Sequence, residues 1–373
     1  MTQSTDAGRS GGLAAEIKDA VTIRAALLVL GVLALQLAFI TSYVGAFHQP
    51  RPHGIPLAVT APAAPATAEQ SVQQLRTLAG TPLAPHTVPD EAAALRQIEH
   101  RDADGALIID PAGTTDRLLV ASGAGASLSQ DLEQVVRLAE ESQGRSLQIV
   151  DAAPAAPGDA RGLSSFYLVV GWCVGGYLCA AILAVSAGAR PANTARAAIR
   201  LGALLLYAVV AGLLGALIAG PVLDALPGGT AALWGLGTLV VFAVGALTLA
   251  CQGLAGVVGI GLAILLVVVL GNPSAGGAYP YPLLPPFWSA VGPALPPGAA
   301  TYAARSIAYF DGNGAAGPVL VLAAWAVAGT AVTLVCAAFR RGRPGAAVGS
   351  GLPDDAGRPE AGADDHPAPA AGR

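Results

Sequence analysis

Long apolar runs and one polar interval divide the chain. Apolar residues dominate positions 25–47, and a polar interval follows from 48 to 163. Beyond it, the chain is apolar again at about 166–187, 198–220, 230–271 and 317–339. A helix needs about 20 apolar residues to cross the roughly 30 Å hydrocarbon core of a bilayer. The pattern therefore predicts a polytopic α-helical membrane protein.

The run at 230–271 is about twice as long as one span requires, at a rise of about 1.5 Å per residue. Gln252 is the only strongly polar side chain within it. We expect two helices here, joined by a tight turn near 252–256. The chain would then have six transmembrane helices: 25–47, four helices within 164–272, and 316–339.

The polar interval 48–163 alternates short apolar runs with stretches of helical spacing. Strands are predicted at IPLAVTA, GALIID and RLLVAS. Helices are predicted at AEQSVQQLRTL, EAAALRQIEHRD and SLSQDLEQVVRLAEES, the last with a serine start signal. Strands that alternate with helices favour a small α/β domain with a βαβ-type sheet, between the first and second spans.

Lys and Arg gather on one set of ends and links. They lie before the first span (Arg9, Lys18, Arg24), between the second and third (Arg190, Arg196, Arg200) and after the last (Arg340, Arg341, Arg343). Short cytoplasmic links carry such an excess. We therefore expect both termini in the cytoplasm, the α/β domain outside, and a location in the cell membrane.

The two ends of the chain differ in character. Within residues 1–24, GGLAAEIKDAVTIRA has the spacing of an amphipathic helix that lies on the inner membrane surface. The tail 340–373 is rich in Pro, Gly, Ala and Asp and has too few large apolar residues to bury a core. We expect it to be disordered.

The charged residues exclude several classes of protein. Only 12% of residues are charged, about half the usual share. No Asp, Glu, Lys or Arg lies at mid-membrane, which argues against proton- or sodium-driven transport and against an ion channel. The only lysine, Lys18, follows no glycine-rich loop, so the chain has no P-loop of its own. We predict no catalytic residues, cofactor or metal, and no nucleic-acid partner.

Small and polar residues within the spans offer further candidates. Ala211, Gly215 and Ala219 form a row that allows close helix packing, either within one bundle or at a dimer seam. The few polar residues are candidates for a transport pathway: Gln36, Thr41, Ser42 and Gln252.

The order of elements resembles the ABC type-2 permeases and the related phage infection protein family. FITSYVGAFHQPRPHGIPLAVTAP is similar to that group's exit from the first span into the outside domain. GNPSAGGAYPYPLLPPFWSAVGPALPPGAATYAARSIAYFDGN is similar to its link between the last two spans. The resemblance covers about residues 20–340. It implies a permease subunit of an ATP-driven exporter that pairs with a second half, as a homodimer or heterodimer, and with separate ATP-binding subunits.

The resemblance also implies a role for the proline- and aromatic-rich link at 273–315. In type-2 permeases this link forms short helices at the membrane face that cap the pathway. We therefore expect a re-entrant or lid segment, with candidate gate residues Phe287, Trp288, Arg305, Tyr309 and Phe310. The alternative is an ordinary interfacial loop.

Two elements on the cytoplasmic side are candidates for docking an ATPase. They comprise the amphipathic helix, with Glu16 and Lys18, and the basic link with Arg190, Arg196 and Arg200. Their charges are equally consistent with simple positive-inside anchoring. The apolar spans favour an amphipathic or lipid-like cargo. The alternative function is a non-transporting membrane scaffold, surface receptor or secretion accessory that uses the outside domain.

Overall fold

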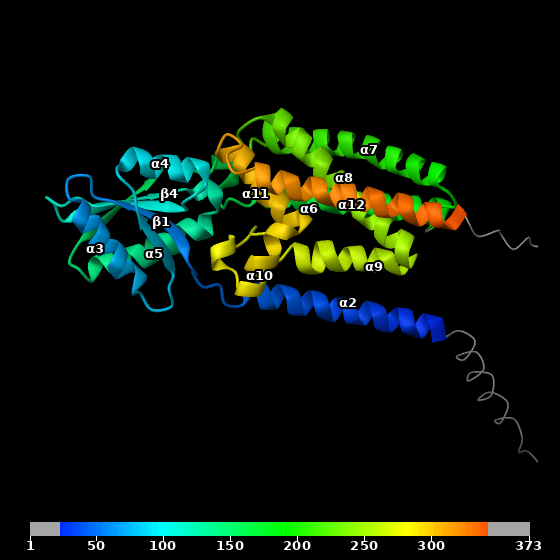
Figure 1. The fold of residues 1–373 in the computed structure, drawn as a ribbon, viewed down its shortest axis with the longest axis horizontal. Coiled ribbons are helices and arrows are strands. Elements are labelled where there is room, and N and C mark those ends of the chain that lie inside the picture. Colours follow the sequence, from blue (N-terminus) through cyan, green and yellow to red (C-terminus); the bar gives the residue numbers. More distant parts are fainter. Residues whose placement is uncertain (1–22, 189, 342–373) are drawn as a thin grey trace, which may run out of the picture.

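The computed structural model describes residues 23–188 and 190–341. An α/β domain lies at one end of a helix bundle, and both ends of the described chain lie at the opposite end (Figure 1). The predicted N-terminal amphipathic helix and almost all of the predicted disordered tail lie outside the described residues.

Five helices of the described chain are long and apolar enough to cross a membrane. They are α2 (Ile23–Phe47), α6 (Ser164–Ala187), α7 (Thr194–Leu217), α8 (Thr230–Ala255) and α12 (Ala316–Arg341). A π-helical turn, Ile218–Val222, extends α7. Each of the five helices coincides with a run predicted from hydropathy, and their length and composition are compatible with a multi-pass membrane protein.

The second half of the run at 230–271 is shorter than a full span. After Gly256, whose φ of +65° turns the chain, α9 (Val258–Ile264) continues as the π-helical η4 (Leu265–Gly271). These 14 residues cover about 21 Å at the α-helical rise. They return the chain to the α/β end (Figure 1). The turn lies where it was predicted, and the sixth full span stays a prediction.

Helix α8 is the centre of the bundle because small residues let its neighbours approach closely. Gly176 of α6 lies against Val241, and Gly329 of α12 lies against Ala246. A Cβ atom at either glycine would be 2.6 Å from α8 backbone. The small row on α7 also packs inside the bundle, where Gly215 faces the indole of Trp172.

The α/β domain contains a five-stranded sheet in the order β2-β1-β3-β4-β5. Its strands are β1 (Ile55–Thr60), β2 (Leu83–Thr87), β3 (Gly105–Ile108), β4 (Thr115–Val120) and β5 (Ser146–Asp151). Strand β1 pairs in parallel with β2 and β3. Strand β4 is antiparallel to β3 and parallel to β5.

Helices cover both faces of this sheet, as a βαβ arrangement requires. Helices α3 (Pro65–Arg76) and α5 (Ala126–Glu141) share one hydrophobic core with the sheet, and α4 (Glu91–His100) shares the core on the other face. The predicted α/β fold is confirmed, although β2 and β5, the two edge strands, were not predicted.

The predicted serine start of α5 was wrong. The helix begins at Ala126, after Gly125 with a φ of +145°. The Ser127 hydroxyl instead donates to the carbonyl of Ala278, 3.0 Å away, because the link between η4 and α11 lies against this end of the helix.

Prolines break the link at 273–315 into short helices, as predicted. These are η5 (Tyr281–Leu283), α10 (Pro286–Val291), η6 (Gly292–Ala294) and α11 (Pro296–Tyr309). Leu283 enters the core beneath α3 and α5, whereas Phe310 enters the core beneath α4. The link therefore holds the α/β domain on both faces of its sheet.

Candidate functional site

A cavity of about 180 Å³, with charged and apolar side chains in its lining, lies where the α/β domain meets this link. The domain contributes Pro56, Arg101 and Asp104, and the link contributes Gly276, Tyr281, Tyr302 and Arg305 among others. We call it the interdomain cavity. Its position between the soluble domain and the helix bundle makes it the principal candidate site.

Arg305 of α11 is one of two guanidinium groups that line the interdomain cavity. It is only 3% exposed, and it donates hydrogen bonds to the carbonyls of Gly276 (2.6 Å), Gly277 (2.7 Å) and Gly162 (3.0 Å). Its Nε is buried without a hydrogen-bond partner. Burial, and then the charge of Arg101, lower the pKa of the Arg305 guanidinium to about 10. It is therefore charged at neutral pH.

Arg101, the second guanidinium, ends α4 in a left-handed conformation. Its Cζ lies 3.5 Å from the centre of the Tyr302 ring, a cation–π contact. Its Nη1 donates to the Tyr302 carbonyl at 3.0 Å and to the Ser306 hydroxyl at 2.9 Å. Within the described chain, neither Arg101 nor Arg305 has a carboxylate within salt-bridge distance.

Tyr281 and Asp104 complete the polar lining. The Tyr281 ring stacks on Tyr302 with 6.5 Å between centroids, and its hydroxyl oxygen is buried without a hydrogen-bond partner. Burial raises the pKa of the Tyr281 phenol, against the opposing charges of Arg305 and Arg101. Burial also raises the pKa of the Asp104 carboxyl to about 6, although the charge of Arg101 opposes it.

The five residues predicted to form a gate are not gathered in one place. Phe287 is 58% exposed on α10, where Trp288 lies beside it in an edge-to-face contact. Arg305 lines the interdomain cavity, and Phe310 is buried in the core of the α/β domain. Tyr309 donates from its hydroxyl to Asp159 at 2.7 Å, and its ring lies against Gly123, where no side chain would fit.

An apolar groove separates α2 from α9 at the end of the bundle remote from the α/β domain. Its volume is about 640 Å³. The residues that line it include Leu28, Gly31 and Leu35 of α2 and Val258, Gly261 and Leu262 of α9. At its other end, α2 is attached: Ser42 donates to the carbonyl of Val269, and Phe47 packs on Tyr279. We call this the α2–α9 groove.

The polar residues predicted to line a pathway are not gathered in one place. Gln36 and Thr41 are exposed on α2, whereas Ser42 is buried in the contact with Val269. Gln252 is buried in the last turn of α8, where its amide nitrogen donates to the Ala180 carbonyl at 3.3 Å. The two buried side chains therefore join neighbouring helices.

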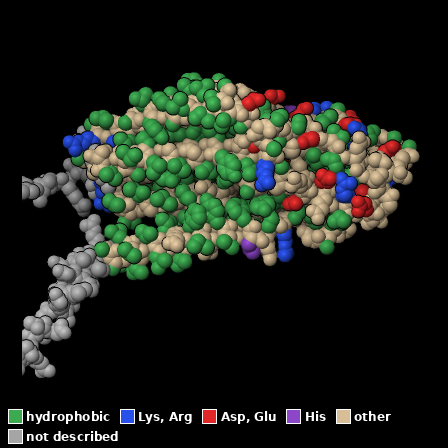
Figure 2. Space-filling model, turned by 180° about the vertical axis from the view of Figure 1, so that it is seen from behind, with side chains coloured by type: hydrophobic (Ala, Val, Ile, Leu, Met, Phe, Trp, Pro, Cys, Tyr) green, Lys and Arg blue, Asp and Glu red, His purple; other side chains and the backbone are tan. Residues whose placement is uncertain are grey.

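The predicted docking arginines differ in exposure. Figure 2 shows basic side chains at the end of the bundle opposite the α/β domain, beyond a largely hydrophobic surface. Arg196 is exposed, and Arg190 donates to the Leu254 carbonyl at 2.9 Å. Arg200 is only 6% exposed, on the inner face of α7. Glu16 and Lys18 lie outside the described residues.

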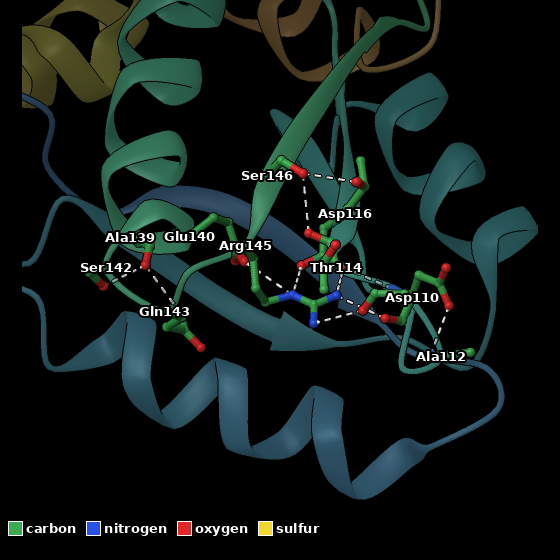
Figure 3. A network of polar contacts seen from close by, with 12 residues as sticks. Asp110, Ala112, Thr114, Asp116, Ala139, Glu140, Ser142, Gln143, Arg145 and Ser146 are labelled. Atoms are coloured by element: carbon green, nitrogen blue, oxygen red, sulfur yellow. Dashed lines mark hydrogen bonds and ion pairs between the residues drawn. The ribbon is translucent and has the colours of Figure 1, made fainter.

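A second polar cluster lies at the far end of the α/β domain (Figure 3). Arg145 forms a bidentate ion pair with Asp116, with N–O distances of 2.5 and 2.6 Å. It also donates a hydrogen bond to the Asp110 carbonyl at 2.8 Å. Burial alone would raise the pKa of Asp116, but the Arg145 hydrogen bonds hold it below its usual value. Burial and the neighbouring Asp116 raise the pKa of Glu140 to about 7.

Sequence reasoning identified one of the cavity residues, Arg305, and missed Arg101, Asp104, Tyr281 and Tyr302. A signal was present at Arg101, because a charged residue between a helix and a buried strand lies near the end of that strand, where the sheet meets other parts of the chain. No protein-family model, curated protein or solved structure matches the chain.

Proposed function

We propose that this chain is the permease subunit of an ATP-driven exporter of amphipathic or lipid-like molecules, with the ATPase on a separate subunit. The observation that carries the proposal is the α2–α9 groove. Its apolar lining suits a molecule that enters the protein laterally from the bilayer. Apolar parts of such a molecule are more stable against apolar side chains than in water.

The attachment of α2 supports a moving role for this helix. Only 6% of its most hydrophobic stretch is buried within the protein, compared with 67% for α8. Its firm contacts, at Ser42 and Phe47, lie near the α/β domain. A helix held at one end can swing at the other with little loss of packing. Such a swing would open or close the groove.

Filling the groove tests the transport role. A Cβ atom at Gly31 or Gly261 would have no neighbour within 4 Å, so larger side chains fit there. We expect Gly31→Trp and Gly261→Trp to fold normally and to reduce export of fluorescent lipid analogues and lipophilic dyes from cells by about tenfold. Gly171→Trp and Gly202→Trp are matched controls, because those glycines are equally open but lie outside the groove. Equal export by all four variants would refute transport through the groove.

The separate ATPase has its own test. Arg196 is exposed, as is Arg190, which is hydrogen-bonded to Leu254. Arg200 is buried, so a charge reversal at Arg200 would test folding as well as docking. We expect an ATPase with a P-loop to purify with the full-length chain from host membranes in mild detergent. Arg196→Glu should release it, and Arg161→Glu, an exposed control near the α/β domain, should not. A chain that purifies without any ATPase would contradict the permease proposal.

A binding role for the α/β domain is the second candidate, favoured by a groove of about 470 Å³ at its far end. The groove lies where β1 and β3 end, and Glu91, Asp110 and Arg117 line it. In α/β sheets, ligands often bind beyond the carboxyl ends of parallel strands. If Arg117→Ala abolished the function in cells and the groove-filling tryptophans did not, the scaffold or receptor role would replace the permease.

A further inference from the structure

The interdomain cavity holds more positive charge than its own residues neutralise. Arg101 and Arg305 both line it, and within the described chain neither has a salt-bridge partner. Asp104 is the only carboxylate among the lining residues. The hydrogen bonds of both arginines are to neutral carbonyl and hydroxyl oxygens, which leave the positive charge of the cavity in place. The cavity therefore favours an anion.

Two donors on residues that line the cavity have no acceptor in the part of the protein that the structure describes. The Nε of Arg305 and the hydroxyl of Tyr281 are buried without hydrogen-bond partners, and Arg305 is 97% buried. A buried donor left without an acceptor is destabilising, because it has lost its hydrogen bonds to water. Such groups in a native structure call for a ligand or water that accepts from them.

The residues that carry these donors line the same cavity. The Tyr281 hydroxyl feels the charges of both Arg305 and Arg101, and its ring stacks on the Tyr302 ring that Arg101 covers. Donors that reach a ligand from two separate elements suit an anion with acceptor oxygens on several sides. Arginine forms strong charge-assisted hydrogen bonds with such groups.

The geometry points to a binding site for a phosphoryl group in the interdomain cavity, held by Arg101, Arg305 and the hydroxyl of Tyr281. The group belongs either to a small soluble phosphate ester or to the headgroup of a phospholipid. The volume of about 180 Å³ admits one such group with accompanying water. This site is independent of the proposed transport activity, because it requires no ATPase and no movement.

Tyr281→Phe is the decisive variant. It removes one hydroxyl that has no partner in the protein, so the fold should tolerate it. Arg305 is less suitable, because its three hydrogen bonds to carbonyls also hold the link in place. Tyr279→Phe is the matched control, since Tyr279 belongs to the same link but does not line the cavity.

The soluble arm measures binding of inorganic phosphate and glycerol 3-phosphate to the full-length chain in phospholipid-free detergent, with sodium chloride at equal ionic strength as the reference. We expect both probes to raise the unfolding temperature of the wild-type protein and of Tyr279→Phe. Tyr281→Phe should bind at least about tenfold more weakly, as expected for one hydrogen bond within a charged site.

The lipid arm uses mass spectrometry of the intact, delipidated protein with phosphatidic acid or phosphatidylcholine added. Retention of phosphatidic acid by the wild-type protein and its loss in Tyr281→Phe would identify a lipid headgroup, and a response in the soluble arm alone would identify a soluble ester. No phosphate response in either arm, or equal binding by Tyr281→Phe, would overturn the site and leave a cavity filled with water.

Discussion

Leu283 and Phe310 lie in one link of the chain, yet they pack into the hydrophobic cores on opposite faces of the same β-sheet. The sheet therefore lies between two anchors that both come from the last third of the sequence. Between these anchors are α10 and α11, and α11 contributes Tyr302 and Arg305 to the interdomain cavity. The α/β domain is thus fixed to the bundle by side chains that complete its own cores.

Phe310→Ala should loosen the α/β domain strongly. The side chain is buried at 5% exposure, and loss of a buried phenylalanine typically costs about 3–5 kcal/mol. We expect a lower unfolding temperature and faster amide hydrogen exchange in α4 and β4. Phe287→Ala, at a ring that is 58% exposed in the same link, is the control and should change neither. Equal effects of the two substitutions would contradict the anchoring role.

Gly176→Ala should weaken the contact between α6 and α8. The added Cβ would lie 2.6 Å from the carbonyl oxygen of Val241, so the two backbones would have to separate. Overpacking of this kind costs about 1–3 kcal/mol. Gly171→Ala lies one to two helical turns away with open space around it, and should be neutral or slightly stabilising. Thermal unfolding of both variants in the same detergent measures the difference.

Glu140→Gln should change how stability depends on pH. The pKa of Glu140 is raised to about 7 from 4.5, so the folded protein binds this proton more tightly than the unfolded chain. The resulting stabilisation is complete below about pH 4.5 and is lost as the pH rises to about 7. The variant should lack this loss and should be more stable than wild type at pH 8.

Denaturant unfolding of the full-length protein between pH 5 and 8 measures this effect as the difference between Glu140→Gln and wild type. Glu141→Gln is the control, because that neighbouring carboxylate is exposed. A difference that stays constant over the pH range would refute the role of Glu140. The ion pair of Asp116 with Arg145 adds no slope here, because the lowered pKa of Asp116 acts only at more acidic pH.

Asp104→Asn should strengthen phosphate binding above about pH 6. Below that pH, the Asp104 carboxyl is largely protonated, and above it the negative charge repels an anion. The other titratable residues that line the cavity are Arg101, Arg305, Tyr281 and Tyr302. The ratio of variant to wild-type affinity for glycerol 3-phosphate should rise between pH 5 and 7.5. Protonation of the probe affects both affinities equally, so it does not change this ratio. A ratio that does not change with pH would show that Asp104 does not face the anion.

Much of the architecture follows from local sequence. The spans are predictable because about 20 apolar residues in a row have few stable alternatives to a membrane helix. Strand β2 was missed because LAPHT contains a proline, which a sheet tolerates at its edge, where β2 lies. Strand β5 was missed at the opposite edge, where its side chains are largely exposed and the apolar signal is weak.

Most of the candidate site could not be predicted from the sequence, because its residues are distant from one another along the chain. Arg101 and Arg305 line one cavity, although about 200 positions separate them. No periodicity or spacing connects a helix end in the α/β domain with a proline-rich link near the last span. The burial of Arg200 could not be predicted from the sequence either. Helix α7 is apolar on most of its surface, so the sequence does not show which side of the helix faces α8.

The two anchors have a consequence for how the protein is made. All five strands have been synthesised once residue 151 is complete, but Phe310 follows about 160 residues later. At roughly 5–20 residues per second, synthesis of that stretch takes about 8–30 s. Until Leu283 is made the new sheet lacks a core residue on each face, and until Phe310 is made it still lacks one, so it is exposed to aggregation and proteolysis. The maturation of the α/β domain is therefore tied to correct membrane insertion of the helices that come after it.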